Sequence, residues 1–175
     1  MMHRRSLGPL AAALAWPALA RAHGQAADKP VISWPTVQLL GGGTWAPDTW
    51  QGRPAIVVIW ATYCPYCMRH NARLDQLHRS ASAHGVRILA VATDTDEAAV
   101  RRYMAEHGYS FPVTLDKGQL RQRLSTRRMI PLTALIQANG QLRMVIPGEM
   151  SEDDIMGLPR LLGIDTPRAS PATTS

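Results

Sequence analysis

The chain has 175 residues, of which 46% are apolar, enough for one globular domain with its own core. The formal net charge of +6 falls to +3 without Arg4, Arg5 and Arg21 of the amino-terminal segment, which indicates a solvated surface and no nucleic-acid-binding face. The chain has two cysteines, so it lacks the second cysteine pair that would complete a structural zinc site, and we expect no metal.

The first residues have the three-part pattern of a secretory signal. Arg4 and Arg5 precede an apolar stretch at 7–20, and Ala20-Arg21-Ala22 has the A-x-A form of a cleavage site. We expect residues 1–22 to be a removed signal peptide and residues 23–30 to be a flexible lead. The apolar stretch is short for a membrane span and contains two prolines, so an uncleaved amino-terminal anchor is the lesser alternative. The pattern predicts a periplasmic protein.

The next segment predicts a hairpin followed by a buried strand. Residues 31–40 alternate well enough for a strand, three glycines at 41–43 turn the chain, and residues 44–45 can return as a short strand. Residues 55–60 (AIVVIW) form an apolar run rich in β-branched side chains, which is typical of a strand buried on both faces of a sheet.

Both cysteines follow this strand, in the phrase WATYCPYC at 60–67. The spacing of apolar residues after it predicts a helix, and Pro65 suits the first helical position. Cys64 would then lie at the helix N-terminus, where unpaired N–H groups and the helix dipole favour a thiolate over a thiol. Cys67, one turn later, is within reach to close a disulfide and is expected to be the less exposed sulfur. An exposed nucleophile with a resolving partner indicates thiol–disulfide exchange.

A purely structural disulfide is the plain alternative to a reactive pair. A bridge between residues three apart closes almost no loop, so it removes little entropy from the unfolded chain. Stability alone therefore gives a weak reason for placing two cysteines at Cys64 and Cys67.

The central part of the chain predicts a βαβ unit and a second helix. Residues 86–93 (VRILAVAT) form another apolar run, and two buried strands joined by a helix imply parallel pairing with a right-handed crossover. We expect Asp94 or Thr95 to cap the following helix and Gly108 to end it. A short helix is expected at 119–124.

The last third predicts a hairpin and a closing helix. Pro131 opens an apolar strand at 132–137, and the residues alone leave open whether its peptide bond is cis or trans. Asn139-Gly140 is a strong hairpin turn that leads to a strand at 142–146. Residues 151–162 read as a helix with Ser151 as its N-cap, and residues 165–175 read as a disordered tail.

Three of these segments together resemble a known family. WATYCPYC at the end of a strand, FPVTLDKG at 111–118 and MIPLTALI at 129–136 are similar to motifs of the thioredoxin superfamily, in particular of its TlpA/ResA-like extracytoplasmic thiol–disulfide oxidoreductases. The resemblance implies an α/β thioredoxin-like domain at 31–164. Its central mixed sheet would be flanked by helices, with an N-terminal β-hairpin and a helix-bearing insertion between the βαβ and ββα halves.

The resemblance also implies roles for individual residues. Cys64 would attack a substrate disulfide and Cys67 would resolve the mixed disulfide. Ile130 would offer its backbone to an extended substrate, beside a cis-proline that packs against the cysteines. The positions expected to support the active site are Trp60, Tyr63, Pro65, Tyr66, His70 and Pro131.

The sequence departs from the family pattern at four places. Tyr63 replaces the usual tryptophan, Pro65-Tyr66 is the dipeptide typical of glutaredoxins, and Val58 stands where thioredoxin has a buried aspartate. His70 stands where many cytochrome-maturation reductants have glutamate. His70 follows Cys67 by one helical turn. Its neutral imidazole would accept the Cys67 proton, whereas an imidazolium would stabilise a thiolate and make the cysteine pair more oxidising. The alternative is a surface histidine that faces water.

The leading prediction is a periplasmic thiol–disulfide oxidoreductase, more a reductase than an oxidant, with cytochrome c maturation as one possible role by family resemblance. It would need no cofactor beyond the redox-active Cys64–Cys67 pair. We expect client proteins with cysteine pairs, a membrane electron-transfer partner, no nucleic acid, and a monomer.

Four alternatives remain for the function. One is a disulfide oxidant or isomerase. Another is a non-enzymatic copper-site assembly chaperone, although that class uses a wider cysteine spacing and a histidine well downstream, and no histidine follows His107 in this sequence. A thiol peroxidase expects a hydroxyl where Ala61 stands. Glutathione-linked chemistry is suggested only by Cys-Pro-Tyr-Cys.

Overall fold

The computed structural model describes residues 30–81, 85–116 and 119–165. The predicted signal peptide at 1–22, the lead up to residue 29 and the tail from residue 166 lie outside the described residues. In the part of the chain that is described, no helix is both long and apolar enough to cross a membrane.

Five strands of the described residues form one mixed sheet in the order β5-β4-β3-β6-β7. Their bounds are Ala55–Trp60 for β3, Arg87–Ala92 for β4, Val113–Leu115 for β5, Leu132–Ile136 for β6 and Leu142–Pro147 for β7. The pairs β3–β4 and β4–β5 are parallel, whereas β3–β6 and β6–β7 are antiparallel. A separate hairpin pairs β1 (Val37–Gln38) with β2 (Thr44–Trp45). The predicted mixed sheet and amino-terminal hairpin are confirmed.

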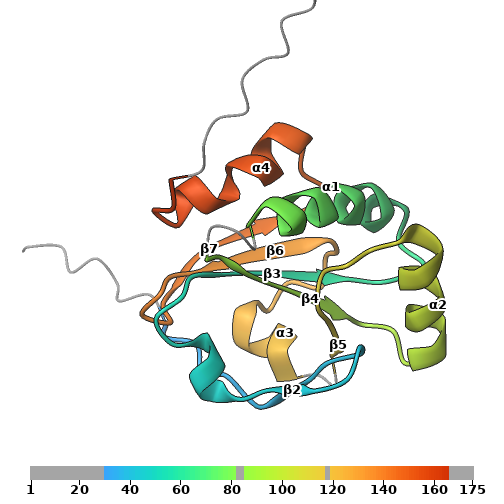
Figure 1. Ribbon diagram of the computed structural model, residues 1–175, viewed down its shortest axis with the longest axis horizontal. Coiled ribbons are helices and arrows are strands. Elements are labelled where there is room, and N and C mark those ends of the chain that lie inside the picture. Colours follow the sequence, from blue (N-terminus) through green and yellow to red (C-terminus); the bar gives the residue numbers. More distant parts are fainter. Residues whose placement is uncertain (1–29, 82–84, 117–118, 166–175) are drawn as a thin grey trace, which may run out of the picture.

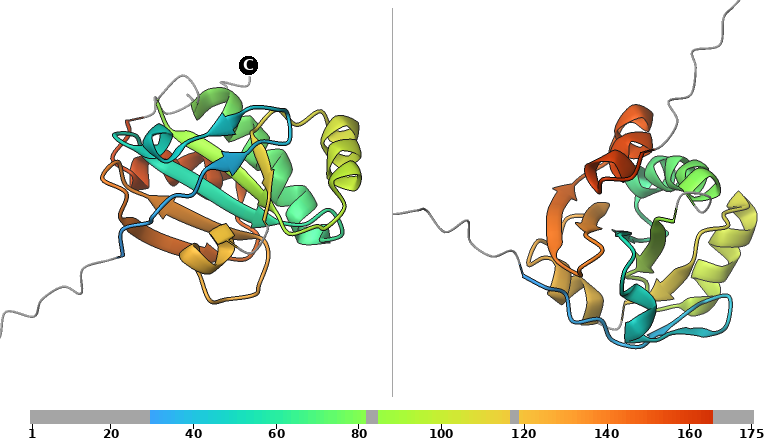
Figure 2. Two further views of the ribbon diagram at one scale, coloured as in Figure 1. Left: turned by 90° about the horizontal axis from the view of Figure 1, so that it is seen from below. Right: turned by 60° about the vertical axis from the view of Figure 1, so that its left-hand side comes forward.

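Helices cover both faces of this sheet. Their bounds are Pro47–Trp50 for the 3-10 helix η1, Pro65–Ala81 for α1, Glu97–His107 for α2, Gln119–Leu124 for α3 and Glu152–Leu161 for α4. Helices α1 and α4 lie side by side on one face, and α3 with the β1–β2 hairpin lies on the other (Figures 1 and 2). Helix α2 flanks the end of the molecule where β5 lies (Figure 1).

Strand β3 is buried along its whole length because both of its faces are covered. Successive side chains of a strand point to opposite faces, so β3 contributes to two cores. Ile56, Val58 and Trp60 enter the core that also holds both cysteines, whereas Val57 and Ile59 enter the core on the hairpin side. The end of β3 that carries Trp60 therefore delivers the chain directly to the cysteines.

Two details differ from the expectation. The strand expected at 31–40 is reduced to Val37–Gln38, with an isolated bridge between Val31 and Gln141. Pro35 interrupts this run because proline has no N–H to donate to a ladder. The helix α2 is capped by Asp96, whose side chain accepts the Ala98 N–H, and not by Asp94 or Thr95.

Other predicted ends are confirmed. Gly108 ends α2 in the left-handed conformation, with φ of 63°. Ser151 caps α4, and its hydroxyl accepts the Asp154 N–H at 3.2 Å. The turn at Asn139-Gly140 joins β6 to β7.

Candidate active site

Cys64 lies immediately before the first turn of α1, as the sequence predicts. Helix α1 begins at Pro65, and the Cys64 carbonyl accepts the N–H groups of Cys67 at 3.0 Å and Met68 at 3.2 Å. The Cys67 N–H also donates to the Cys64 sulfur, at 3.2 Å. A sulfur at this position faces the free N–H groups and the positive end of the helix dipole, which stabilise a thiolate there.

The two sulfurs differ in their environment. Cys67 is completely buried and Cys64 is 8% exposed; both are free thiols in this structure. The prediction that Cys67 is the less exposed sulfur is confirmed, but Cys64 is more covered than expected, since its Sγ lies 3.9 Å from the Ile130 carbonyl oxygen. Burial raises the pKa of the Cys67 thiol, and the neighbouring Cys64 raises it further. Cys67 therefore keeps its proton until it reacts.

The segment before β6 completes the site from the other side. The Ile130–Pro131 peptide bond is cis, as the family resemblance implies. The Pro131 carbonyl accepts the Gly148 N–H at 2.8 Å, which ties this segment to the loop after β7. Together with the contact between Cys64 Sγ and the Ile130 carbonyl, this brings Pro131 and Ile130 to the cysteines.

The predicted aromatic residues fall into two groups. Trp60 is fully buried beneath the site, whereas Tyr63 and Tyr66, on either side of Cys64, are 72% and 60% exposed. Met129, next to Ile130, is also exposed. The guanidinium of Arg69 lies over the Tyr66 ring, 5.3 Å from its centroid. We call these three exposed side chains, Tyr63, Tyr66 and Met129, the rim, because they belong to the two segments that meet at the Cys64 sulfur.

His70 is completely buried, so the alternative of a surface histidine is wrong. Its Nδ1 accepts the Met150 N–H at 3.4 Å, and its Nε2 lies 3.3 Å from the Thr133 hydroxyl oxygen. Because Nδ1 accepts, a neutral ring carries its hydrogen on Nε2 and donates to Thr133. Burial lowers the pKa of His70 to about 4, so the ring is neutral near pH 7. No hydrogen bond joins it to Cys67 among the described residues.

The position of His70 connects three elements. Helix α1 supplies His70, β6 supplies Thr133 and the loop after β7 supplies Met150. The same loop is fixed from outside, because Glu149 accepts hydrogen bonds from Arg69 at 2.8 Å and Arg73 at 2.9 Å. The buried imidazole therefore holds the cis-proline strand and this loop against the cysteine helix.

Asp94 is a site residue that sequence reasoning missed. It was expected to cap α2, but its carboxylate accepts the Thr62 N–H at 3.1 Å and the Thr62 hydroxyl hydrogen as well. It thereby fixes the loop between β3 and Cys64. The sequence signal that could have revealed this role is the position of Asp94 directly after a predicted parallel strand. The carboxyl ends of neighbouring parallel strands lie at one edge of the sheet, so residues that follow them lie close together.

Replacing Asp94 by alanine is expected to lower the free energy of unfolding by about 1.5–3 kcal/mol, because a charged acceptor shared by two donors is lost. Urea unfolding checks this, with Glu106→Ala as the control because Glu106 is an exposed acid on α2. Equal stability of the two variants would show that Asp94 does not fix the loop.

A comparison with protein families and known proteins agrees with this geometry. The model of the Redoxin family matches residues 27–160. The thiol-disulfide oxidoreductase ResA of Halalkalibacterium halodurans is 33% identical over 102 residues, 58% of each chain. The ResA of Geobacillus kaustophilus is 27% identical over 106 residues, 61% of each chain. The match thus spans about three fifths of the length of these curated relatives.

Solved structures show the same fold. A thiol:disulfide interchange protein of the thioredoxin family from Chlorobium tepidum has a TM-score of 0.70 at 22% identity, covering 77% of this chain and 96% of that one. StoA from Bacillus subtilis has a TM-score of 0.64 at 17% identity, with coverages of 74% and 98%. A secreted Mycobacterium tuberculosis disulfide oxidoreductase homologous to E. coli DsbE has a TM-score of 0.63 at 24% identity, with coverages of 73% and 95%. The predicted thioredoxin-like fold and the TlpA/ResA-like resemblance are confirmed.

Proposed function

Because the chain belongs to the Redoxin family, we propose that it is a thiol–disulfide oxidoreductase that exchanges its Cys64–Cys67 pair with cysteine pairs of client proteins. The observation that carries this proposal is the environment of Cys64. Its sulfur receives an N–H of α1 at 3.2 Å and faces the Ile130 carbonyl beside a cis-proline, at a point where the site opens to the surface.

The exchange proceeds in two steps. The Cys64 thiolate attacks one sulfur of a client disulfide, so a Cys64–client bond forms while the client's other sulfur leaves with the electron pair and takes up a proton. Cys67 then loses its proton and attacks the Cys64 sulfur, which releases the client's second sulfur as a thiol. The client gains two electrons and two protons, and the Cys64–Cys67 disulfide is formed. The reverse sequence oxidises a client dithiol.

The surface around Cys64 suits an extended client segment. Ile130 would pair with the client backbone next to the attacked sulfur, a short β-type contact. Apolar surface is exposed next to this β-type contact by the rim residues Tyr63, Tyr66 and Met129. Apolar residues beside the client cysteine would bind there. Specificity for a client would then come mainly from this rim.

The environment of the two sulfurs supports a reductase more than an oxidant. A strong oxidant needs a stabilised reduced form, in which a cation or a hydrogen bond favours the thiolate. His70 is neutral near pH 7 and does not supply that cation, while burial keeps Cys67 as a thiol. An oxidant or isomerase remains the second candidate, since the helix N–H group at Cys64 favours a thiolate in the reduced pair.

We place the protein in the periplasm with a membrane electron-transfer partner that re-reduces the pair, and cytochrome c maturation is one role consistent with this. The leader pattern at 1–22 supports export. The relative from Mycobacterium tuberculosis is described as secreted. In an oxidising compartment a reductase needs a dedicated electron source.

The reduction potential of the Cys64–Cys67 pair tests the proposal. The mature protein is equilibrated with glutathione mixtures and followed by tryptophan fluorescence, since Trp60 is packed in the same core as both sulfurs. A potential near that of thioredoxin, about −270 mV, supports a reductase, and one near that of DsbA, about −120 mV, supports an oxidant. A pair that cannot be cycled contradicts both assignments.

A further inference from the structure

Three side chains near Cys67 carry buried polar atoms that have no hydrogen-bond partner among the described residues. They are the Trp60 indole N–H, both polar atoms of the Asn71 amide, and the Tyr103 hydroxyl. Buried polar groups are almost always paired in native proteins, and an unpaired one is costly, so each calls for a partner. We refer to Trp60, Asn71 and Tyr103 as the buried polar cluster.

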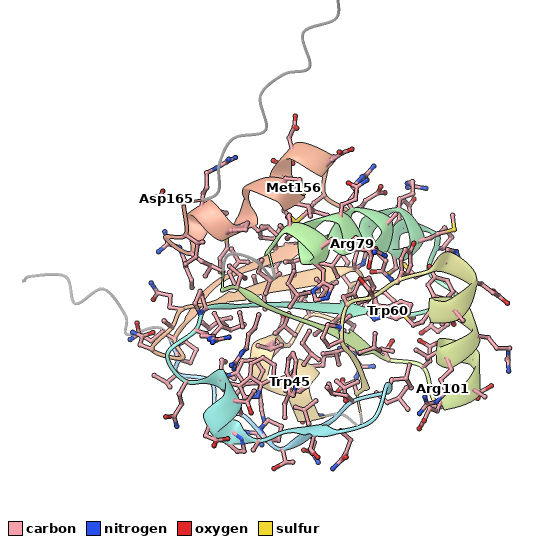
Figure 3. The ribbon with its side chains drawn as sticks, viewed as in Figure 1. Trp45, Trp60, Arg79, Arg101, Met156 and Asp165 are labelled. Carbon is pink, nitrogen blue, oxygen red and sulfur yellow. The ribbon has the colours of Figure 1, made fainter. Side chains whose placement is uncertain are left out.

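The buried polar cluster lies beside the resolving cysteine. Asn71 is completely buried and follows Cys67 by four residues on α1, so both lie on one face of the helix. Trp60 shares a core with Cys67, and Tyr103 of α2 packs against it with ring centroids 5.2 Å apart. Figure 3 labels Trp60 beside α2, at the end of the sheet that α2 flanks.

Tyr103 packs against the core that holds both sulfurs, and their charge acts on its hydroxyl. The pKa of Tyr103 is raised to about 12, mainly by burial, and negative charge on Cys67 or Cys64 contributes to the rise. The Asn71 amide opposes it, although the two groups do not reach hydrogen-bond geometry. A small polar molecule between them would satisfy both.

Among the described residues, no hydrogen bond joins Cys67 to His70, which the sequence suggested as its proton acceptor. His70 directs its nitrogens to Thr133 and Met150. Val58 lies opposite Thr133 in the sheet and has no acceptor. The carboxylate of Asp94 is the acidic group whose charge acts on Cys67, and it is already engaged by Thr62.

We propose that the buried polar cluster binds a water molecule and that, together, they form the path by which the Cys67 proton leaves during the resolving step. Tyr103 is the group that passes the proton, because a hydroxyl both donates and accepts hydrogen bonds. Trp60 only donates and the Asn71 amide does both, so these two are positioning residues. Four polar atoms are enough to hold one water, which needs two to four partners. This inference rests on the proposed function.

In the resolving step one S–H bond and one S–S bond break, and one S–S bond and one S–H bond form. The Cys67 S–H bond breaks as its sulfur forms a bond to the Cys64 sulfur, and the bond between Cys64 and the client breaks. The client sulfur leaves with the electron pair. The Cys67 proton enters the water, and the Tyr103 hydroxyl passes a proton on toward solvent, from which the client thiolate is protonated. No electron acceptor other than the client disulfide is needed.

The two sulfurs can be timed separately in the full reduced chain with 5,5′-dithiobis(2-nitrobenzoate). Attack by Cys64 releases the first thionitrobenzoate, and attack by Cys67 on the resulting mixed disulfide releases the second. We expect Tyr103→Phe to leave the first release unchanged and to slow the second by about tenfold or more, because positioned proton transfer contributes about 10²–10⁴-fold to such steps. The solvent deuterium isotope effect on the second release should be smaller in the variant.

Tyr109→Phe is the matched control, because Tyr109 belongs to the same aromatic group but its hydroxyl donates to the Met68 carbonyl at 3.3 Å. Asn71→Leu is a second variant, used after urea unfolding has shown that it folds, and should slow the same release. An unchanged second release in both variants overturns the proposal. A slower second release with an unaltered isotope effect and pH profile also overturns the proposal, because a change in core packing would then explain the slower rate.

The outcome for the unmodified chain separates this inference from the proposed function. If the chain releases no second thionitrobenzoate, the two cysteines do not act as an exchanging pair and the proposed function fails. If it releases both, the function stands and the variants alone decide the role of the buried polar cluster.

Discussion

Replacing Cys64 by serine is expected to abolish disulfide exchange, lowering its rate by on the order of 10³-fold or more. Replacing Cys67 by serine should leave the first attack intact and trap the client in a mixed disulfide. The reason is that the two sulfurs have different surroundings. Cys64 faces the helix N–H groups and reaches the surface, whereas Cys67 is completely buried. A client sulfur can therefore reach Cys64 but not Cys67.

Mass spectrometry of each variant after mixing with a disulfide-bonded peptide measures this directly. The Cys67→Ser variant should gain the mass of one peptide half, and the Cys64→Ser variant should gain none. A trapped adduct on Cys67 in the Cys64→Ser variant would contradict the assigned order of the two cysteines. The unmodified chain, which should resolve its adduct, is the control.

The second large effect concerns His70 and the dependence of stability on pH. Its pKa falls from 6.5 to about 4 on folding because the ring is buried. Above pH 6.5 the ring is neutral in both states and its burial carries no proton-linked penalty. As the pH falls from 6.5 to 4, His70 becomes protonated in the unfolded chain but stays neutral in the folded chain. The free energy of unfolding therefore falls by about 3 kcal/mol over this range.

We therefore expect His70→Gln to be less stable than the unmodified protein at pH 7, by about 1–3 kcal/mol, through the altered hydrogen bonds to Thr133 and Met150. Near pH 4 the difference should shrink or reverse, because glutamine has no proton to gain. Urea unfolding at several pH values gives the difference curve, and His107→Gln, at an exposed position, is the control. A constant difference between pH 7 and pH 4 would show that His70 is not buried as a neutral ring.

The elements that carry the site could be predicted from the sequence, but the contacts between distant site residues could not. The run AIVVIW, the proline after Cys64 and the Asn-Gly turn are local signals, since each depends on side-chain period or backbone preference within a few residues. They predicted β3, the start of α1 and the β6–β7 hairpin correctly. Asp94 was misassigned because a capping preference is also local, whereas its contact with Thr62 spans 32 residues.

By itself, then, the sequence determined most of the elements, the place of Cys64 just before α1 with Cys67 in its first turn, and the family to which their motif belongs. These follow from local patterns of apolar residues, proline and cysteine. Only the tertiary structure decided what surrounds the sulfurs. It turned His70 inward toward Thr133 and Met150, and it buried polar atoms of Trp60, Asn71 and Tyr103 without a hydrogen-bond partner among the described residues. Burial and contacts between distant segments set proton affinity, and neither has a signature within a short stretch of chain.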